Sequence, residues 1–81
     1  MDIKKILEKE NSTIEELFDC IEQVKKNGDV MVIKLDGMRV DKQYTVFITF
    51  PIEKKKEMIR YDEDNLRKAI INTLTFYVKV I

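Results

Sequence analysis

The chain has 81 residues, with no histidine, no tryptophan and one cysteine, and its 15 basic and 15 acidic side chains cancel to a net charge of zero. Histidine is the side chain that most readily transfers protons near neutral pH, and it is the commonest metal ligand. A structural zinc or a disulfide would need more cysteines. The composition therefore argues against metal binding and nucleophilic catalysis, and it predicts a non-enzymatic protein.

A chain of this length makes a single domain, residues 1–81. A domain this small buries only about 60–65 % of the surface that its unfolded chain exposes, and its core supplies about 3–5 kcal/mol of net stability. Association with a second copy is an ordinary way to add stability when disulfides and metals are absent. We therefore expect a homodimer.

Three features predict where the protein works. Cys20 lies within an apolar helical stripe and is predicted to be buried, and an unpaired thiol is typical of a reducing cytoplasm. The opening residues Met1–Lys5 run directly into an amphipathic segment and do not resemble a signal peptide. No apolar run approaches the roughly 20 residues that a membrane-spanning helix needs. The sequence predicts a cytoplasmic protein with no membrane segment.

Two helices are predicted in the first third of the chain. Residues 2–10 place three apolar side chains on one face: Ile3, Ile6 and Leu7. The second helix, residues 13–27, begins with an S/T-x-x-E capping box, formed by Ser12 with Glu15 or by Thr13 with Glu16, and ends at an Asn-Gly stop. Its apolar side chains recur at helical spacing: Ile14, Leu17, Phe18, Ile21 and Val24.

The middle of the chain is predicted to form an antiparallel hairpin. Residues 30–35 are rich in β-branched and aliphatic side chains, and residues 44–50 alternate in polarity. The Asp-Gly pair at positions 36 and 37 is a strong hairpin signal, and Pro51 ends the second strand because it has no N–H to donate. Residues 38–43 fit either a continuation of the hairpin or a polar loop.

Alternation assigns the strand residues to two faces. Helices cover only one face of a two-layer fold, and the side chains expected to face them are Tyr44, Val46, Ile48 and Phe50. The opposite face is expected to carry Val30, Val32, Lys34, Thr45, Phe47, Thr49 and, from a third strand, Ile59 and Tyr61. This second set is too apolar for a solvated surface, and a contiguous patch of that kind usually marks an interface.

The last third is predicted to hold a short edge strand and a long helix. Residues 58–61 form the strand, and Asp62 is expected to cap the helix. The helical periodicity continues to about residue 78, but residues 75–81 are also rich in β-formers, so a terminal strand remains an alternative. A second apolar stripe runs beside the first along this helix: Ile71, Leu74, Val78 and Ile81.

The order of the elements predicts the fold class. Two helices precede two or three strands and a final helix, without internal repeats or low-complexity linkers. Helices and antiparallel strands that are segregated in this way are typical of α+β proteins. We expect a two-layer sandwich with two N-terminal helices, an antiparallel sheet of two or three strands and a C-terminal helix.

No motif for catalysis is present. The chain lacks a P-loop and a dinucleotide fingerprint, and its two glycines cannot build a glycine-rich phosphate cradle. Consecutive acidic residues near position 62 are explained by helix capping. No residue is predicted to be catalytic or to bind a metal, and no cofactor is expected.

Basic side chains cluster between positions 39 and 60. The candidate binding residues for an anionic ligand are Arg39, Lys42, Lys54, Lys55, Lys56 and Arg60. Residues 1–29 hold five basic and eight acidic side chains, so positive charge is in excess after them. A nucleic acid or a signalling nucleotide is the ligand expected there. However, a nucleic-acid-binding domain of this size is usually distinctly basic, and a solvated loop is the competing interpretation.

Apolar residues that the predicted fold leaves uncovered are the candidates for a protein interface. They come from the outer sheet face and from the second stripe of the last helix: Val30, Val32, Phe47, Ile71, Val78 and Ile81. We expect self-association, or binding of a protein partner, through one of these surfaces. The competing interpretation is an error of one residue in the register, which would exchange the two faces.

The C-terminal half carries one resemblance. Tyr44–Phe50, a charged connector and then Tyr61–Ile70 resemble the strand-to-final-helix region of small phage-encoded α-β-β-α sandwich proteins, in which a capped helix opens with an apolar residue followed by Ala-Ile. Small phage and mobile-element proteins often act by occupying the surface of a host protein. The chain resembles that class in size, in its Lys/Ile-rich composition and in its lack of catalytic residues. We therefore expect an inhibitor that binds a host defence or regulatory protein, and the basic residues give the alternative, a binder of an anionic ligand.

Overall fold

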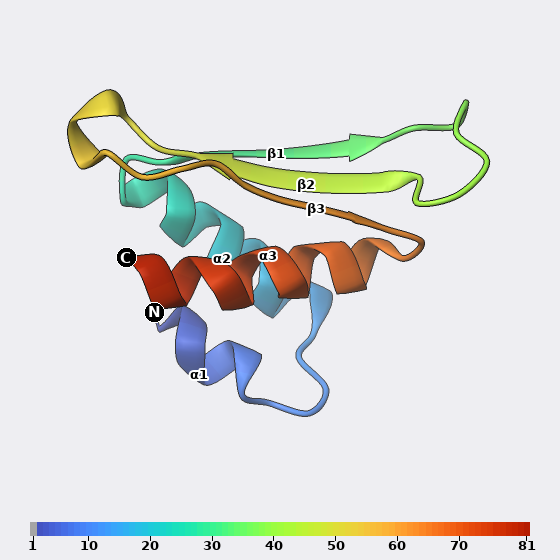
Figure 1. Cartoon of the computed structure of the whole chain (residues 1–81). Helices are drawn as coiled ribbons and strands as arrows, with labels where there is room; N and C mark the ends of the chain where they lie inside the picture. Colours follow the sequence, from blue (N-terminus) through green and yellow to red (C-terminus); the bar gives the residue numbers. More distant parts are fainter. Residues whose placement is uncertain (1) are drawn as a thin grey trace.

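The computed structural model describes residues 2–81 (Figure 1). Its elements are α1 (Ile3–Leu7), α2 (Ile14–Lys26), β1 (Val30–Leu35), β2 (Tyr44–Thr49), the short 3-10 helix η1 (Ile52–Lys54), β3 (Ile59–Glu63) and α3 (Leu66–Val80). Three helices and a three-stranded antiparallel sheet make this an α+β fold, as the sequence predicts.

The sheet has the order β1-β2-β3, so each strand pairs with its neighbour in sequence. Val46 in the central strand stands opposite Ile33 of β1 and Tyr61 of β3, and all three side chains point to the same face. All helices lie on that side of the sheet (Figure 1). Helix α3 packs against β2 and β3, while α2 packs against β1.

Helix α1 contacts α2 and α3 but no strand of the described chain. It forms a further tier beneath these two helices (Figure 1). Its residues Ile3 and Ile6 are buried and belong to the core cluster. The two ends of the chain lie close together there, because Asp2 and Ile3 line the same surface pocket as Val78 and Ile81. None of the described helices is both long enough and apolar enough to cross a bilayer.

The core lies between the sheet and the helices. Its fully buried side chains include Leu17, Cys20, Val24, Val46, Ile48, Ala69, Leu74 and Tyr77. The ring of Tyr77 stacks on Phe50 with a centroid separation of 5.9 Å. Burial, reinforced by the nearby acidic residues Asp19 and Glu16, raises the pKa of the Cys20 thiol to about 11. Cys20 is thus a buried, protonated structural residue, in agreement with the prediction.

Helix α2 starts at the second of the two predicted capping boxes. The Thr13 hydroxyl accepts a hydrogen bond from the backbone N–H of Glu16, and the Glu16 carboxylate accepts one from the backbone N–H of Thr13. This box satisfies two backbone donors that the first helical turn leaves free. The predicted apolar stripe is only partly buried, because Ile14 and Phe18 are exposed.

The predicted cap of the last helix is wrong. Asp62 belongs to β3, and α3 is capped by Asn65, whose side chain accepts a hydrogen bond from the backbone N–H of Lys68. Acidic residues are favourable at a helix start, but pairing with β2 extends the strand through Glu63 and delays the helix. Cross-strand contacts of this kind are not visible in local sequence.

Two alternatives that the sequence leaves open are decided by the structure. Residues 38–43 form a loop between β1 and β2, and the C-terminal segment is helical to Val80. The β-forming composition of the last turns is overridden because α3 packs between the sheet and α1, which buries Thr73, Leu74 and Tyr77.

The predicted face of two residues is also wrong. Ile59 and Tyr61 lie on the helix side of the sheet, since they pair with Ile48 and Val46, and opposed residues of antiparallel strands share a face. The alternation of β2 predicts the two faces of that strand correctly. The register of β3 against β2 could not be read from the sequence, because no tight turn fixes it.

Candidate functional site

The side of the sheet that faces away from the helices is the main candidate surface, and we call it the open face. Its side chains are Val30, Val32, Lys34, Thr45, Phe47, Thr49, Arg60 and Asp62. Phe47 stands in the central strand between Val32 and Arg60. Val30 is 56 % exposed, and Val32 and Phe47 are half-buried, so this part of the open face is apolar and accessible.

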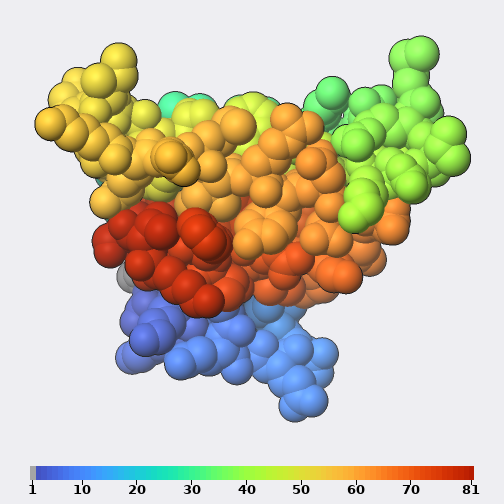
Figure 2. Space-filling model, viewed as in Figure 1, coloured from blue at the N-terminus to red at the C-terminus, as the bar shows by residue number. Residues whose placement is uncertain are grey.

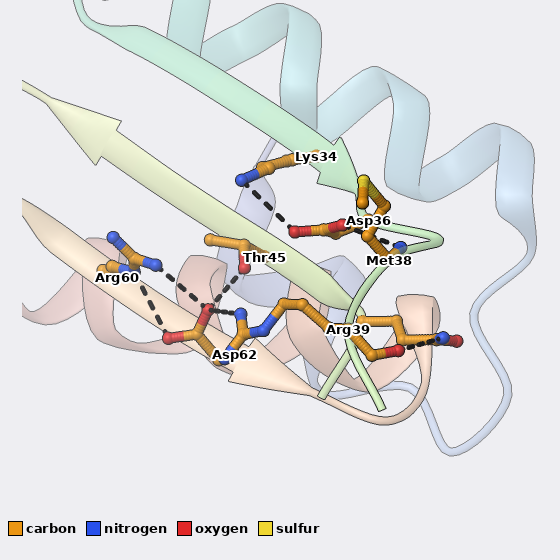
Figure 3. Close-up of polar contacts among 8 residues, drawn as sticks. Lys34, Asp36, Met38, Arg39, Thr45, Arg60 and Asp62 are labelled. Carbon is orange, nitrogen blue, oxygen red and sulfur yellow. Dashed lines mark hydrogen bonds and ion pairs between the residues drawn. The ribbon is translucent and has the colours of Figure 1, made fainter. Parts of the chain in front are cut away.

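The other part of the open face is a polar cluster around Asp62 (Figure 3). Arg60 donates two hydrogen bonds to the carboxylate, at 3.2 and 3.3 Å, and Arg39 reaches over from the β1–β2 loop to donate a third at 3.2 Å. The buried hydroxyl of Thr45 donates to the same group. One carboxylate thus fixes the position of two guanidinium groups.

The electrostatics of the cluster follow from these donors. The hydrogen bond from Thr45 and those from Arg60 and Arg39 stabilise the ionised carboxylate and hold the pKa of Asp62 far below its ordinary value of 3.8. Nearby, the Lys34 ammonium lies 3.5 Å from the Asp36 carboxylate. The basic groups at this end of the sheet are therefore partly neutralised.

The lowered pKa predicts how stability depends on pH. A carboxyl group whose pKa is lower in the folded state stabilises the fold above its unfolded pKa, and this contribution is lost as the pH falls. We expect the free energy of unfolding to decrease below about pH 4, and Asp62→Asn to flatten that decrease while reducing stability at neutral pH. Urea unfolding at neutral pH and at about pH 3 measures both effects. The control Asp41→Asn, in the exposed loop, should keep the wild-type slope, and an equal slope in both variants would contradict the assignment.

The β1–β2 loop, residues 36–43, is held by its own polar groups. The Asp36 carboxylate accepts a hydrogen bond from the backbone N–H of Met38 at 3.0 Å, which is an Asx turn. Gln43 Nε2 donates to the carbonyl of Arg39 at 2.7 Å. The Arg39 guanidinium is also bound to Asp62. Hydrogen bonds therefore hold the loop at Met38, Arg39 and Gln43.

The same loop displays two apolar side chains to solvent. Near the start of β2, the backbone N–H of Lys42 donates a hydrogen bond to Asp64 Oδ1 at 2.5 Å, which connects the loop to the β3–α3 turn. Met38 and Val40 are nevertheless 95 % and 99 % exposed. Ordered loops that present apolar groups offer contact area without a large cost in conformational entropy. The loop therefore extends the candidate surface beyond the sheet.

The second group of candidate residues, Lys54–Lys56, lies at the opposite end of the sheet. Lys54 Nζ donates to Asp29 Oδ1 at 2.6 Å and to the carbonyl of Asn27 at 2.8 Å. The Tyr77 hydroxyl donates to Asp29 Oδ2 at 2.6 Å, and the Asp29 side chain is fully buried. We call this network the Asp29 clamp. It joins the start of β1, η1 and α3.

The Asp29 clamp is satisfied within the chain. Asn27 Nδ2 donates to the Tyr77 hydroxyl at 3.0 Å, so every buried polar group of the network has a partner. Burial, followed by the hydrogen bond to Asp29, raises the pKa of Tyr77 to about 12. A surface pocket of about 620 Å³ opens beside the clamp, and it is lined by Asn27, Asp29, Lys54, Lys56, Tyr77 and Ile81.

The structure does not bring the predicted basic residues into one patch. Arg39 and Lys42 lie in the β1–β2 loop, whereas Lys54, Lys55 and Lys56 lie in the β2–β3 connection, and the two connections project from opposite ends of the molecule (Figure 2). Arg60 lies between them in β3, bound to Asp62. These residues are close in sequence but not in space, because β2 carries the chain from one end of the sheet to the other between Lys42 and Lys54.

The candidates on α3 have neighbours within the chain. Ile71 and Val78 are half-buried against the core, and they line pockets together with Leu7 and Ile3 of α1. The second stripe of α3 is thus largely covered by α1, and Ile81, at 59 % exposure, is its accessible end. Among the predicted interface residues, Val30, Val32 and Phe47 are the set that shares one uncovered surface.

Comparisons with protein-family models, with curated proteins and with solved structures find no match. Within residues 2–81, no group of three or more histidine, cysteine or acidic side chains is placed to hold a metal ion. A function for the open face must therefore be argued from the positions, exposure and charges of its own side chains.

Sequence reasoning missed the carboxylates that organise both ends of the sheet. The sequence predicts Asp62 as a helix cap and gives no role to Asp29, yet each carboxylate accepts hydrogen bonds from distant segments. Asp62 did carry one local signal. Arg60 two positions earlier shares its strand face, as alternate residues of a strand do.

Proposed function

We propose that this chain is a non-enzymatic interaction protein that binds another protein through the open face of its sheet. The observation that carries the proposal is the accessible apolar strip of Val30, Val32 and Phe47, next to two positioned arginines. Aromatic and arginine side chains are enriched in protein interfaces and often dominate their energy. Met38 and Val40 widen the contact area.

The proposal includes the kind of partner. The sheet and the pair α2–α3 serve as the two layers of a sandwich, which presents the open face as a platform. Small size, the lack of catalytic motifs and the resemblance to phage-encoded sandwich proteins support an inhibitor that occupies a host defence or regulatory protein in the cytoplasm. The partner surface that fits would offer an apolar pocket for Phe47 and carboxylates for Arg39 and Arg60.

The test is affinity capture with matched variants. The wild-type chain is used to capture proteins from a lysate of the cells that carry its gene, and the affinity of the captured partner is measured by calorimetry. We expect Phe47→Ser to weaken binding at least tenfold, because truncating a buried aromatic anchor costs on the order of 2 kcal/mol. Phe76→Ser, on the exposed side of α3, is the matched control.

The outcomes separate the proposal from its rivals. Both serine variants are first checked for folding by circular dichroism, since Phe47 is half-buried. Loss of binding with Phe47→Ser alone supports the open face. Equal loss with Phe76→Ser, or no loss with either, would place the interface elsewhere and remove the proposal.

The alternative proposal is a binder of an anionic ligand at the Lys54–Lys56 end. The pocket beside the Asp29 clamp favours it, because Lys56 lines the pocket together with a tyrosine. The ligand class would be a nucleotide or single-stranded nucleic acid. Fluorescence titration with oligonucleotides and cyclic nucleotides at low and high salt tests it, since phosphate contacts produce a salt-dependent affinity. No binding at low salt would remove this alternative.

A further inference from the structure

Strand β1 leaves one edge of the sheet without a partner. It is an outer strand of the order β1-β2-β3, and within residues 2–81 it pairs only with β2. The backbone N–H of Asp36 donates to the carbonyl of Gln43 at 2.8 Å, which marks this pair as hydrogen-bonded. Alternation along the strand then directs the backbone groups of Met31, Ile33 and Leu35 to the free edge.

The free edge of β1 lacks the features that protect edge strands. Its six residues contain one charge, Lys34, and no proline or bulge. By contrast, β3 at the other edge is shorter and carries three charged side chains: Arg60, Asp62 and Glu63. Long apolar edges without protection pair readily with another strand. The asymmetry between the two edges singles out β1.

An exposed apolar stripe of α2 runs beside this edge. A groove of about 300 Å³ is lined by Ile21, Glu22 and Lys25 of α2 and by residues 29–31. Phe18 and Ile14 continue the side of α2 that carries Ile21, because they precede it by three and seven positions. They are 55 % and 40 % exposed although they belong to an amphipathic helix. Leu35, on the same side of the sheet, is 63 % exposed.

We infer that β1 pairs in antiparallel fashion with β1 of a second copy of this chain. The two copies are related by a two-fold axis that passes through the Ile33 pair, perpendicular to the sheet. The two sheets then form one continuous sheet, and the exposed α2 stripes meet on its helix side. In this register Ile33 faces Ile33 of the copy and Met31 faces Leu35 of the copy. Each of these pairs exchanges two backbone hydrogen bonds. A register shifted to an axis at Val32 would leave the outward groups of Leu35 without a partner in the strand.

Charge and symmetry favour a second copy as the occupant. A two-fold axis sets α2 antiparallel to its copy, and α2 carries Glu15 and Glu16 in its first turn and Lys25 and Lys26 in its last. The acidic end of each helix thus points toward the basic end of the other. On the open face, Lys34 stands opposite Val32 of the copy, so no like charges are directly opposed. The dimer joins the edges of β1 and leaves Phe47, in the central strand β2, uncovered, so it does not block the proposed binding through the open face.

Sedimentation of the full chain over a range of micromolar concentrations tests the dimer. We expect wild-type dimers, and we expect Phe18→Lys and Leu35→Lys to raise the dissociation constant at least tenfold, because each places a charge in the apolar contact. The matched controls are Phe76→Lys and Val40→Lys, which change exposed apolar residues elsewhere and should leave the dimer intact.

A cysteine pair tests the register. In a hydrogen-bonded antiparallel pair the Cα atoms are about 5.5 Å apart, which is within the range of a disulfide. Ile33→Cys is therefore expected to form a covalent dimer under mild oxidation. Leu35→Cys is the control, because the two copies of position 35 are about 13 Å apart along the strand. The native Cys20 is buried, so we expect it to form no cross-link in either variant.

Each outcome decides the inference. A wild-type chain that sediments as a monomer overturns it, and that result leaves open-face binding untouched. A dimer that resists both Phe18→Lys and Leu35→Lys also overturns it, since the contact would lie elsewhere. Cross-linking of Leu35→Cys in place of Ile33→Cys overturns the register. A dimer sensitive to the two lysine variants, with cross-linking through position 33, supports the whole arrangement.

Discussion

We expect Asp29→Ala to lower the free energy of unfolding by about 2–4 kcal/mol. The substitution leaves the buried hydroxyl of Tyr77 without its acceptor and removes the counter-charge of Lys54. Removing one partner of a buried ion pair costs about 3–5 kcal/mol. We expect a smaller loss of stability for Asp29→Ala because the side chain of Lys54 is 36 % exposed and can be hydrated. Urea unfolding followed by circular dichroism measures the change.

Graded variants identify the Asp29 clamp as the cause. Asp29→Asn keeps one acceptor oxygen, and we expect about half of the loss. Lys54→Met leaves the buried carboxylate with fewer donors and should be clearly destabilising, whereas Lys56→Met, in the same connection, should be nearly neutral. Equal effects of the two lysine variants would contradict the clamp.

The second large effect is expected for Leu74→Ala in α3. Leu74 is fully buried in a helix that packs against β2, β3 and α1, so the truncation leaves a cavity that the surrounding elements cannot easily fill. Leucine-to-alanine changes at such sites cost about 2–5 kcal/mol. A domain of this size has only about 3–5 kcal/mol of net stability. We therefore expect a substantially unfolded population at room temperature, measured by circular dichroism and amide exchange.

The same helix provides the control. Phe76→Ala removes a larger side chain that is 44 % exposed, and we expect less than about 1 kcal/mol of destabilisation. A loss with Phe76→Ala that matches the loss with Leu74→Ala would mean that α3 is rotated about its axis. A stable Leu74→Ala variant would mean that dimer formation supplies stability that the single chain lacks, and dilution would then reveal it.

The fold class could be predicted because local patterns coincide with the tertiary structure. The period of 3.6 in residues 14–24 and the period of two in residues 44–50 each reflect an element that is buried along one side. The boundaries near Asp62 could not be predicted. A carboxylate followed by two acidic residues fits a helix start, and only pairing with Tyr44 and Thr45 makes this segment a strand.

The candidate site was predictable only in its apolar part. Alternation alone places Val30, Val32 and Phe47 on one face, so this apolar strip can be predicted from the sequence. The polar part depends on Arg39 crossing from a loop to Asp62, a contact between residues far apart in the chain. The exposed stripe of α2 was also missed, because the helical period shows which residues share a side but not how wide the covered side is.

The neighbouring ends of the chain have a practical consequence for every binding experiment described above. Both ends of the chain lie on the helical side of the sheet (Figure 1). Asp2 and Ile81 line one surface pocket there. A fluorophore, affinity tag or surface tether at either end is thus directed away from Phe47. Immobilised and labelled molecules should keep the open face accessible, whichever end is chosen for attachment.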